Sequence, residues 1–487
     1  MNNEIGRKIT SLTLLSILLA SGVTFAVPGA ISSAEASHNA NLFVSAENSA
    51  FSNYFAGPQV IEVVVNDPNI NKLDDALGEP DVTVNGKKLR MAQATDGNWY
   101  GYFADRVQAM TADNTQDTDS TTADGDGLNF GGFCDNDDGA SLRATGSLAV
   151  SDTVGFAIPR DETVTGEVDS TAPTALSTTC SGDPIGSDNL AMHVIRENKT
   201  LNKAYPGNIA LEGGQIGVLQ NAWPFIQLYD FSAGGNVVIK YNKGGGAQTT
   251  TLTFDTIPSN LVNTSLDRAT YPQGAQVHVT LTDPQLNIDP TDEDSWTWGT
   301  NSTNSTLYYQ LFDENGIADS SAINAENLIG NLTSLMFEKN GKLTVNLAAS
   351  GSTVAVFGDN DDQVFPATVM PKTIHQQMSF VESGANVGIF GNYDESDNAN
   401  LDITSTAPRG QSATIRYNDV SKSVVVGFGF GTLGITIEDG EWNSGEEVPV
   451  TLVDSDANKN SRSDEDLDNN QNSTSLIPSL RVGSPFT

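Results

Sequence analysis

The chain has 487 residues and a formal net charge of −37 at pH 7, from 24 Lys and Arg against 61 Asp and Glu. This length accommodates about two to four domains, each with its own core. So acidic a surface repels nucleic acid and attracts cations, which argues against DNA or RNA binding. Adaptation to a salty medium would explain the same charge without a specific ligand, and composition does not separate the two explanations.

Residues 1–36 predict a secretory signal peptide. Arg7 and Lys8 precede an apolar core from Leu12 to Ala20, and Ala34-Glu35-Ala36 forms an A-x-A cleavage site. No later stretch approaches the roughly 18 unbroken apolar residues of a membrane span, so we expect no further transmembrane anchor. The mature chain is therefore expected to be secreted.

A strand-and-turn pattern then occurs three times along the chain. A run rich in β-branched residues leads into a turn rich in oxygen-bearing side chains at Val60–Asn71, at Val277–Asn287 and at Val448–Asn458. Alternate side chains of such a run face a core, and the Asp and Asn that follow turn the chain. Recurrence at such long intervals predicts tandem domains that open in the same way.

Later landmarks recur in the same order, since Val237–Tyr241 is echoed by Ala413–Tyr417. We therefore predict a first domain over residues 37–260 and a second over 261–436. Residues 437–487 then hold the incomplete start of a third domain, followed by a polar tail.

Short strand runs are separated by hairpin turns such as Asn85-Gly86 and Asp96-Gly97, and few stretches show the period of an amphipathic helix. The sequence therefore predicts an all-β fold of tandem immunoglobulin-like β-sandwich domains with long acidic loops.

The turn of the third copy has the oxygen spacing of a calcium loop, in which alternate side chains turn inward and a Glu at the twelfth position supplies two oxygens. The donors in this turn are Asp454, Asp456, Asn458, Asn460 and Glu465. Against a calcium loop, Lys459 stands where glycine is usual at the sixth position.

Four further groups of acidic and amide side chains are thinner candidates for calcium. They are Asp67, Asn69 and Asn71; Asp283, Asn287 and Asp289; Asp135, Asp137 and Asp138; and Asp359, Asp361 and Asp362. We expect calcium at one or more of these loops, although Asp and Asn also form ordinary turns without a metal.

The only two cysteines, Cys134 and Cys180, predict a disulfide, because a secreted chain meets an oxidising medium. Two unpaired thiols are the alternative. Six Asn-x-Ser/Thr sequons are candidate glycosylation sites, although such short motifs also arise by chance in a chain rich in Asn and Thr. They lie at Asn198, Asn263, Asn301, Asn304, Asn331 and Asn472.

Enzyme signatures are mostly missing from the sequence. The four histidines are scattered without zinc or copper spacing, and the chain has no Gly-x-Ser-x-Gly elbow or phosphate loop. No carboxylate pair stands out from the acidic background. We therefore expect no enzymatic activity, and we assign no catalytic residue and no organic cofactor.

Long phrases of the chain resemble the major surface-layer (S-layer) proteins of ammonia-oxidising archaea. The phrases are Met1–Leu14, Ala40–Ser49, Gly57–Val63, Gly78–Gly86 and Asp96–Asp105. The resemblance implies a secreted protein of serial immunoglobulin-like domains that crystallises in two dimensions as the outermost coat of the cell, usually glycosylated and calcium-dependent. Such proteins are much longer than this chain, so we expect a fragment, a truncated product or a short paralogue.

The leading hypothesis is a structural coat protein that self-associates into an S-layer lattice, with calcium bridging or stiffening its acidic loops. Its charge would also make the coat a sieve that attracts cations such as ammonium. The alternative is a secreted, calcium-stabilised adhesin or glycan-binding module, because fold alone does not choose between these functions. An extracellular hydrolase ranks third.

Overall fold

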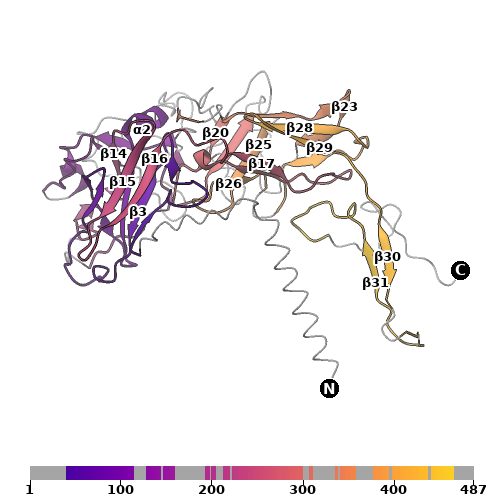
Figure 1. Ribbon diagram of the computed structural model, residues 1–487, viewed down its shortest axis with the longest axis horizontal. Coiled ribbons are helices and arrows are strands. Elements are labelled where there is room, and N and C mark those ends of the chain that lie inside the picture. The colour runs from indigo at the N-terminus through magenta and orange to yellow at the C-terminus, as the bar shows by residue number, and fades with distance from the viewer. Residues whose placement is uncertain are drawn as a thin grey trace. The chain divides into compact units, whose positions relative to one another are not determined.

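The computed structural model describes residues 40–113, 128–143, 146–158, 192–197, 199–204, 212–219, 222–299, 307–310, 335–337, 341–357, 377–393, 397–436, 440–441 and 443–465. Asn41–Thr487 is one compact unit, distinct from Met1–Ala40 (Figure 1). The predicted signal peptide lies outside the described residues. Among the residues that the structure describes, no helix is long and apolar enough to cross a membrane.

The prediction of an all-β fold is confirmed, because the described chain forms several separate sheets and little helix. Two sheets are built from residues between 42 and 254. The larger contains, in spatial order, β1 (Leu42–Val44), β3 (Ile61–Val65), β7 (Trp99–Asp105), β14 (Ile226–Tyr229), β10 (Phe156–Ile158) and β9 (Gly132–Cys134), with β6 (Ala92–Gln93) also pairing with β7. The smaller contains β2 (Tyr54–Phe55), β16 (Gln248–Phe254), β15 (Gly235–Tyr241), β4 (Val82–Val84) and β5 (Lys87–Leu89).

The strands form because their apolar residues alternate, as β3 shows with every second side chain buried. The two sheets share one aromatic core. Phe55 of the smaller sheet meets Phe103 of the larger edge to face, with ring centroids 6.1 Å apart. After β7 the chain turns into α2 (Arg106–Asp113), a short helix that buries Ala109 and Ala112.

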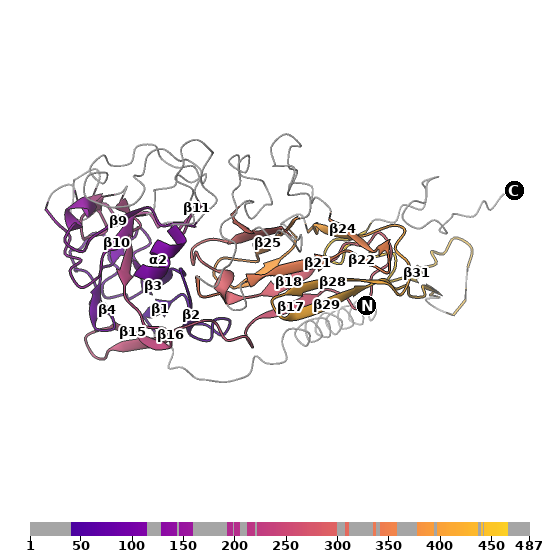
Figure 2. The same cartoon turned by 90° about the horizontal axis from the view of Figure 1, so that it is seen from above.

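A second group of sheets is built from residues between 263 and 425 (Figure 2). The largest contains β17 (Asn263–Leu266), β18 (Val279–Thr282), β26 (Ile389–Gly391), β25 (Gln377–Glu382), β19 (Ser295–Gly299) and β20 (Leu307–Tyr309). A three-stranded sheet contains β21 (Leu343–Asn346), β28 (Ser412–Tyr417) and β29 (Val420–Val425). Trp298 of the first meets Tyr417 of the second with ring centroids 5.9 Å apart, so these sheets also share a core.

Short elements complete the described chain. They are the ladders of β8 (Leu128–Asn129) with β11 (Met192–His193), β12 (Glu212–Gly213) with β13 (Val218–Leu219), β22 (Ala348–Ala349) with β23 (Ser352–Thr353), and β24 (Ala355–Phe357) with β27 (Leu401–Ile403), and the 3-10 turns η1 (Gly139–Leu142) and η4 (Pro284–Leu286). The predicted domain limits and the immunoglobulin-like topology stay predictions.

The three copies of the sequence pattern open with the same antiparallel ladder. β1 pairs with β3, β17 with β18, and β30 (Thr432–Ile435) with β31 (Val450–Val453). The three ladders can be compared at the residue two places before the Asp of each turn, which pairs with a residue of the preceding strand. These pairs are Leu42 with Val65, Thr264 with Leu281, and Leu433 with Leu452.

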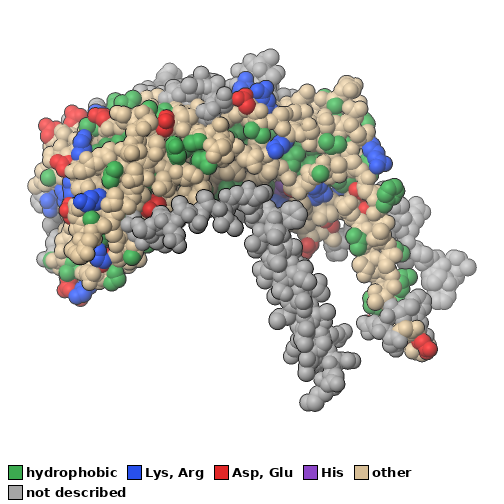
Figure 3. All heavy atoms as spheres, viewed as in Figure 1, with side chains coloured by type: hydrophobic (Ala, Val, Ile, Leu, Met, Phe, Trp, Pro, Cys, Tyr) green, Lys and Arg blue, Asp and Glu red, His purple; other side chains and the backbone are tan. Residues whose placement is uncertain are grey.

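The third ladder differs in burial. Leu42 and Val65 are at most 1% exposed, whereas the equivalent Leu433 and Leu452 are 67% and 41% exposed. Figure 3 shows apolar side chains on the surface of this ladder. In the first two copies a second sheet covers these positions. The ladder formed by β30 and β31 therefore presents an apolar surface to solvent.

A buried carboxylate ends the opening strand of the first two copies and ties it to the second sheet. Asp67 Oδ2 accepts a hydrogen bond from the Tyr241 hydroxyl at 3.0 Å, and Asp283 Oδ2 accepts one from the Tyr417 hydroxyl at 2.7 Å. Both aspartates are at most 1% exposed. Each hydroxyl therefore satisfies an acceptor that water cannot reach.

We expect Tyr417→Phe to lower the free energy of unfolding by about 1–3 kcal/mol, because the buried Asp283 carboxylate loses a donor. Tyr241→Phe is the matched control. Asp67 keeps the Lys243 ammonium 3.0 Å away, so this change should cost less. Urea unfolding of both variants measures the difference, and an equal or reversed order would contradict the role given to these hydroxyls.

Candidate cation-binding loops

In the first copy the protein itself satisfies the turn carboxylate. Asp67 Oδ1 accepts from the Asn69 backbone N–H at 3.0 Å and from its side-chain amide at 2.9 Å, while Lys243 pairs with Oδ2. Burial alone would raise the pKa of Asp67, but the hydrogen bonds from Asn69, Lys243 and Tyr241 outweigh it and lower the pKa. The Lys243 ammonium thus stands where a bound cation would balance this charge. Asn71, the third candidate ligand of this turn, is only partly buried.

The second copy builds a closed loop from Asp283 to Asp294. Asp283 Oδ1 accepts from the Gln285 backbone N–H at 3.0 Å, so the loop begins with the same turn as the first copy. At the far end, Asp294 Oδ2 accepts from the Asp289 backbone N–H at 3.1 Å and also from that of Ile288. Between these ends, Asp289 Oδ1 accepts from the Thr291 backbone N–H at 2.8 Å, and Asp292 Oδ1 accepts from that of Glu293 at 2.9 Å.

The third copy repeats this construction. Asp454 Oδ1 accepts from the Asp456 backbone N–H at 3.0 Å, and Glu465 Oε1 accepts from the backbone N–H groups of Asn460, at 2.6 Å, and Lys459. Lys459 does not adopt a positive φ, so this loop does not need glycine at that position. Glu465 and Asp294 therefore have the same structural role.

Sequence reasoning missed Asp294. It stands at the same distance along the chain from Asp283 as Glu465 does from Asp454, and this offset was the signal that could have identified it. Glu382 was missed as well. Its Oε1 accepts from the Gly388 backbone N–H at 2.6 Å, and Oε2 accepts from that of Asp294 at 3.2 Å. No local sequence pattern marks Glu382.

Each of these two loops is also held by the copy that precedes it. The Val60 N–H donates to the Ile288 carbonyl at 3.0 Å, and the Gln276 N–H donates to the Lys459 carbonyl at 2.8 Å. Val60 precedes Asp67 by as many residues as Gln276 precedes Asp283. The acceptors Ile288 and Lys459 likewise occupy equivalent positions in their loops. We call these two contacts the first and second junctions.

At both junctions a side chain also donates a hydrogen bond to the carbonyl of the residue just before the junction acceptor. Gln59 Nε2 donates to the Asn287 carbonyl at 2.6 Å, and Arg268 Nη1 donates to the Asn458 carbonyl at 2.9 Å. The backbone of Asn287 and Asn458 is thus occupied by protein donors, and Arg268 also holds the Asn458 side-chain oxygen at 2.9 Å. These loops are structural joints as well as candidate cation sites.

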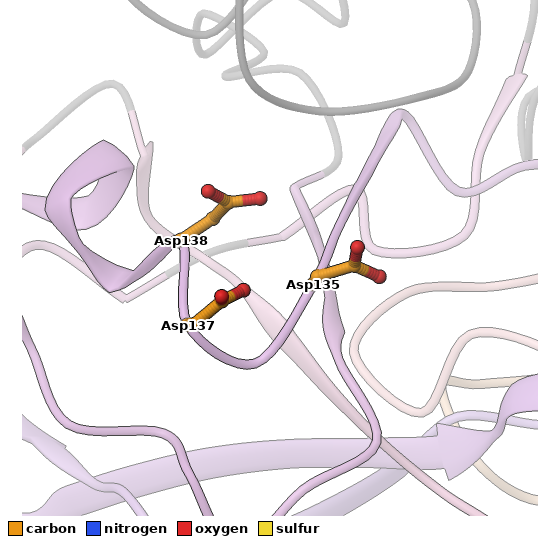
Figure 4. A group of neighbouring side chains, drawn as sticks. All are labelled: Asp135, Asp137 and Asp138. Carbon is orange, nitrogen blue, oxygen red and sulfur yellow. The ribbon is translucent and has the colours of Figure 1, made fainter.

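A different loop brings three carboxylates close together. Asp135, Asp137 and Asp138 each offer an oxygen, and these oxygens lie within 4.8 Å of one another (Figure 4). Across the residues that the structure describes, this is the one such group of three or more His, Cys, Asp or Glu side chains. Asp135 and Asp137 are exposed, and Arg106 lies 3.7 Å from Asp135. Hard oxygen donors so placed suit Ca²⁺.

The disulfide-bonded Cys134 immediately precedes this loop and is buried. The sequence placed its partner at Cys180, which lies outside the described residues. The candidate ligands Asp359, Asp361 and Asp362 also lie outside them, as do the sequons at Asn198, Asn301, Asn304, Asn331 and Asn472. Asn263 is described, and its exposed side chain at the start of β17 would be accessible to a glycan.

Comparisons with known proteins add little. No protein family and no curated protein matches the chain. A solved structure of domains 4–9 of surface layer protein SbsC is similar to it at 9% sequence identity and a TM-score of 0.15. The match covers 50% of this chain and 26% of that one, so the chain spans about a quarter of that structure. A likeness of this size carries no argument about function.

Burial of the second loop changes its acid–base behaviour. Burial raises the pKa of Asp289 to about 7 and that of Asp294 to about 6, although Arg196 beside them acts in the opposite direction. Burial likewise raises the pKa of Glu382. These acids bind protons more tightly when the chain is folded, so proton uptake stabilises the fold fully below the unfolded values and is lost as pH rises through the folded ones.

We therefore expect the thermal midpoint, measured in chelator, to be higher at about pH 5.5 than at about pH 7.5. Asp289→Asn should flatten this dependence, because its side chain no longer titrates. Scanning calorimetry at both pH values measures the effect. A midpoint that rises with pH over this window would contradict the assigned pKa shifts.

Proposed function

We propose that the chain is a structural protein of a cell-surface coat and self-associates into a two-dimensional S-layer lattice. The observation that carries the proposal is the repeated junction, in which an equivalent backbone hydrogen bond holds the acidic loops of the second and third copies to the copy that precedes each. Serial units joined in the same way suit a protein whose function is mechanical. We propose no enzymatic activity for the chain.

Charge supports a part for cations in such a coat. Copies at −37 repel one another unless counter-ions condense between them. We propose that calcium bridges or stiffens exposed acidic loops, with Asp135, Asp137 and Asp138 as the leading site. A coat of this sign would also concentrate ammonium and other cations near the cell.

The apolar ladder of β30 and β31 supports self-association. Leu433, Ile435, Val450 and Val453 on this ladder are between 53% and 67% exposed, and no charged side chain lies within either strand. Burying an apolar surface of this kind against a partner removes it from water, which favours assembly. Another copy of the chain is the partner that a lattice supplies.

Electron microscopy of the purified mature chain tests the coat directly. We expect ordered sheets in the presence of calcium, and we expect the sheets to dissolve when a chelator removes it. A soluble monomer under both conditions that retains a glycan would contradict the coat and favour a secreted adhesin or glycan-binding module. Unchanged ammonium partitioning into coats whose carboxylates have been neutralised would reject the sieve.

The calcium proposal is tested separately on the soluble chain by calorimetric titration. Changing both Asp137 and Asp138 to Asn should remove one bound calcium, because two of the three grouped carboxylates lose their charge. Asp230→Asn, an exposed change outside this group, is the matched control and should leave the titration unchanged. Equal calcium uptake by both variants would exclude a site at Asp135, Asp137 and Asp138.

A further inference from the structure

Arg196 contacts the acidic loop of the first junction, and the repeated turn pattern does not explain this contact. The Arg196 side chain is 8% exposed, and the side chains of Asp289 and Asp294 beside it are fully buried. Four residues after Arg196, the chain is tied to the first part of the structure, because the Thr200 carbonyl accepts from the Thr95 N–H at 2.8 Å. The Arg196 guanidinium, held from the side of the first copy, therefore enters the acidic loop of the second copy.

Every nitrogen of the guanidinium has an acceptor in the second copy. Nε lies 3.3 Å from Asp292 Oδ2, Nη1 donates to the Tyr309 hydroxyl at 2.7 Å, and Nη2 donates to Asp294 Oδ1 at 3.2 Å. Nη2 also donates to the Glu293 carbonyl at 2.8 Å. A planar fork matches acceptors spread around its edge, whereas a compact ammonium would reach only some of them.

The backbone of the same residue adds to this contact. The Arg196 N–H donates to Asp289 Oδ2 at 2.7 Å, and Nη1 lies 3.6 Å from that oxygen. Removing the arginine would leave buried carboxylates without their cation, which is a costly state. In the third copy Asn460 stands in the place of Asp289, so the second junction has less charge to balance.

We propose that Arg196 is an internal counter-ion that locks the first junction, and that Asp292, Asp294, Tyr309 and the Glu293 carbonyl form a guanidinium-shaped cation site. The arginine is provided in cis, so this junction stays closed without added metal. When the arginine is removed, the site accepts a free guanidinium ion in its place. This proposal is independent of the coat function.

The test is Arg196→Ala in the full chain, with hydrogen exchange of residues 288–294 as the readout. We expect exchange in this segment to accelerate roughly tenfold or more. Low-millimolar guanidinium chloride should restore the original rate, whereas the same concentration of sodium chloride should not. Arg90→Ala is the matched control, because Arg90 pairs with Glu79 at 2.9 Å in the loops beside β4 and β5, and it should leave this segment unchanged.

Unchanged exchange in the Arg196→Ala protein would overturn the lock. Restoration by calcium but not by guanidinium would overturn the guanidinium-shaped site and assign it to a metal. If the alanine variant does not fold, Arg196→Lys retains the charge without the planar fork. We expect that variant to exchange residues 288–294 several-fold faster than the original chain, and an unchanged rate would contradict the part given to the fork.

Discussion

The need to satisfy a buried carboxylate at the end of the opening strand in the first two copies organises this structure. A carboxylate out of reach of water must find donors, and Asp283 finds them in the backbone of its own turn and in a tyrosine of the second sheet. Asp67 does the same with Tyr241. One side chain therefore ends a strand, shapes a turn and holds two sheets together.

The same chemistry extends from the turn to the junction. Asp294 and Glu465 each close a loop by accepting two successive backbone N–H groups, which places a loop carbonyl where the preceding copy can donate to it. Acidic side chains thus act here as acceptors for the protein's own amides. The carboxylates of Asp135 and Asp137, by contrast, are exposed.

Much of this fold could be predicted from the sequence, because a period of two and short turns are local properties. The equivalence of the opening strands, and of Tyr241 with Tyr417, was visible as repeated phrases. The use of the acids was not visible. Asp67 has the appearance of a free ligand in the sequence, yet Lys243 and Asn69 already satisfy it in the fold. Arg196 pairs with a loop far along the chain, and no local pattern reports such a contact.

Residue-resolved amide exchange of Val60 and Gln276 tests the central claim most directly. If both junctions are the same joint, these two amides should be protected to a similar degree and well beyond exposed loop amides, since each donates to a loop carbonyl. Exchange of either amide at the rate of an unprotected loop would contradict the account, because the acidic loops would then not be held by the copies that precede them.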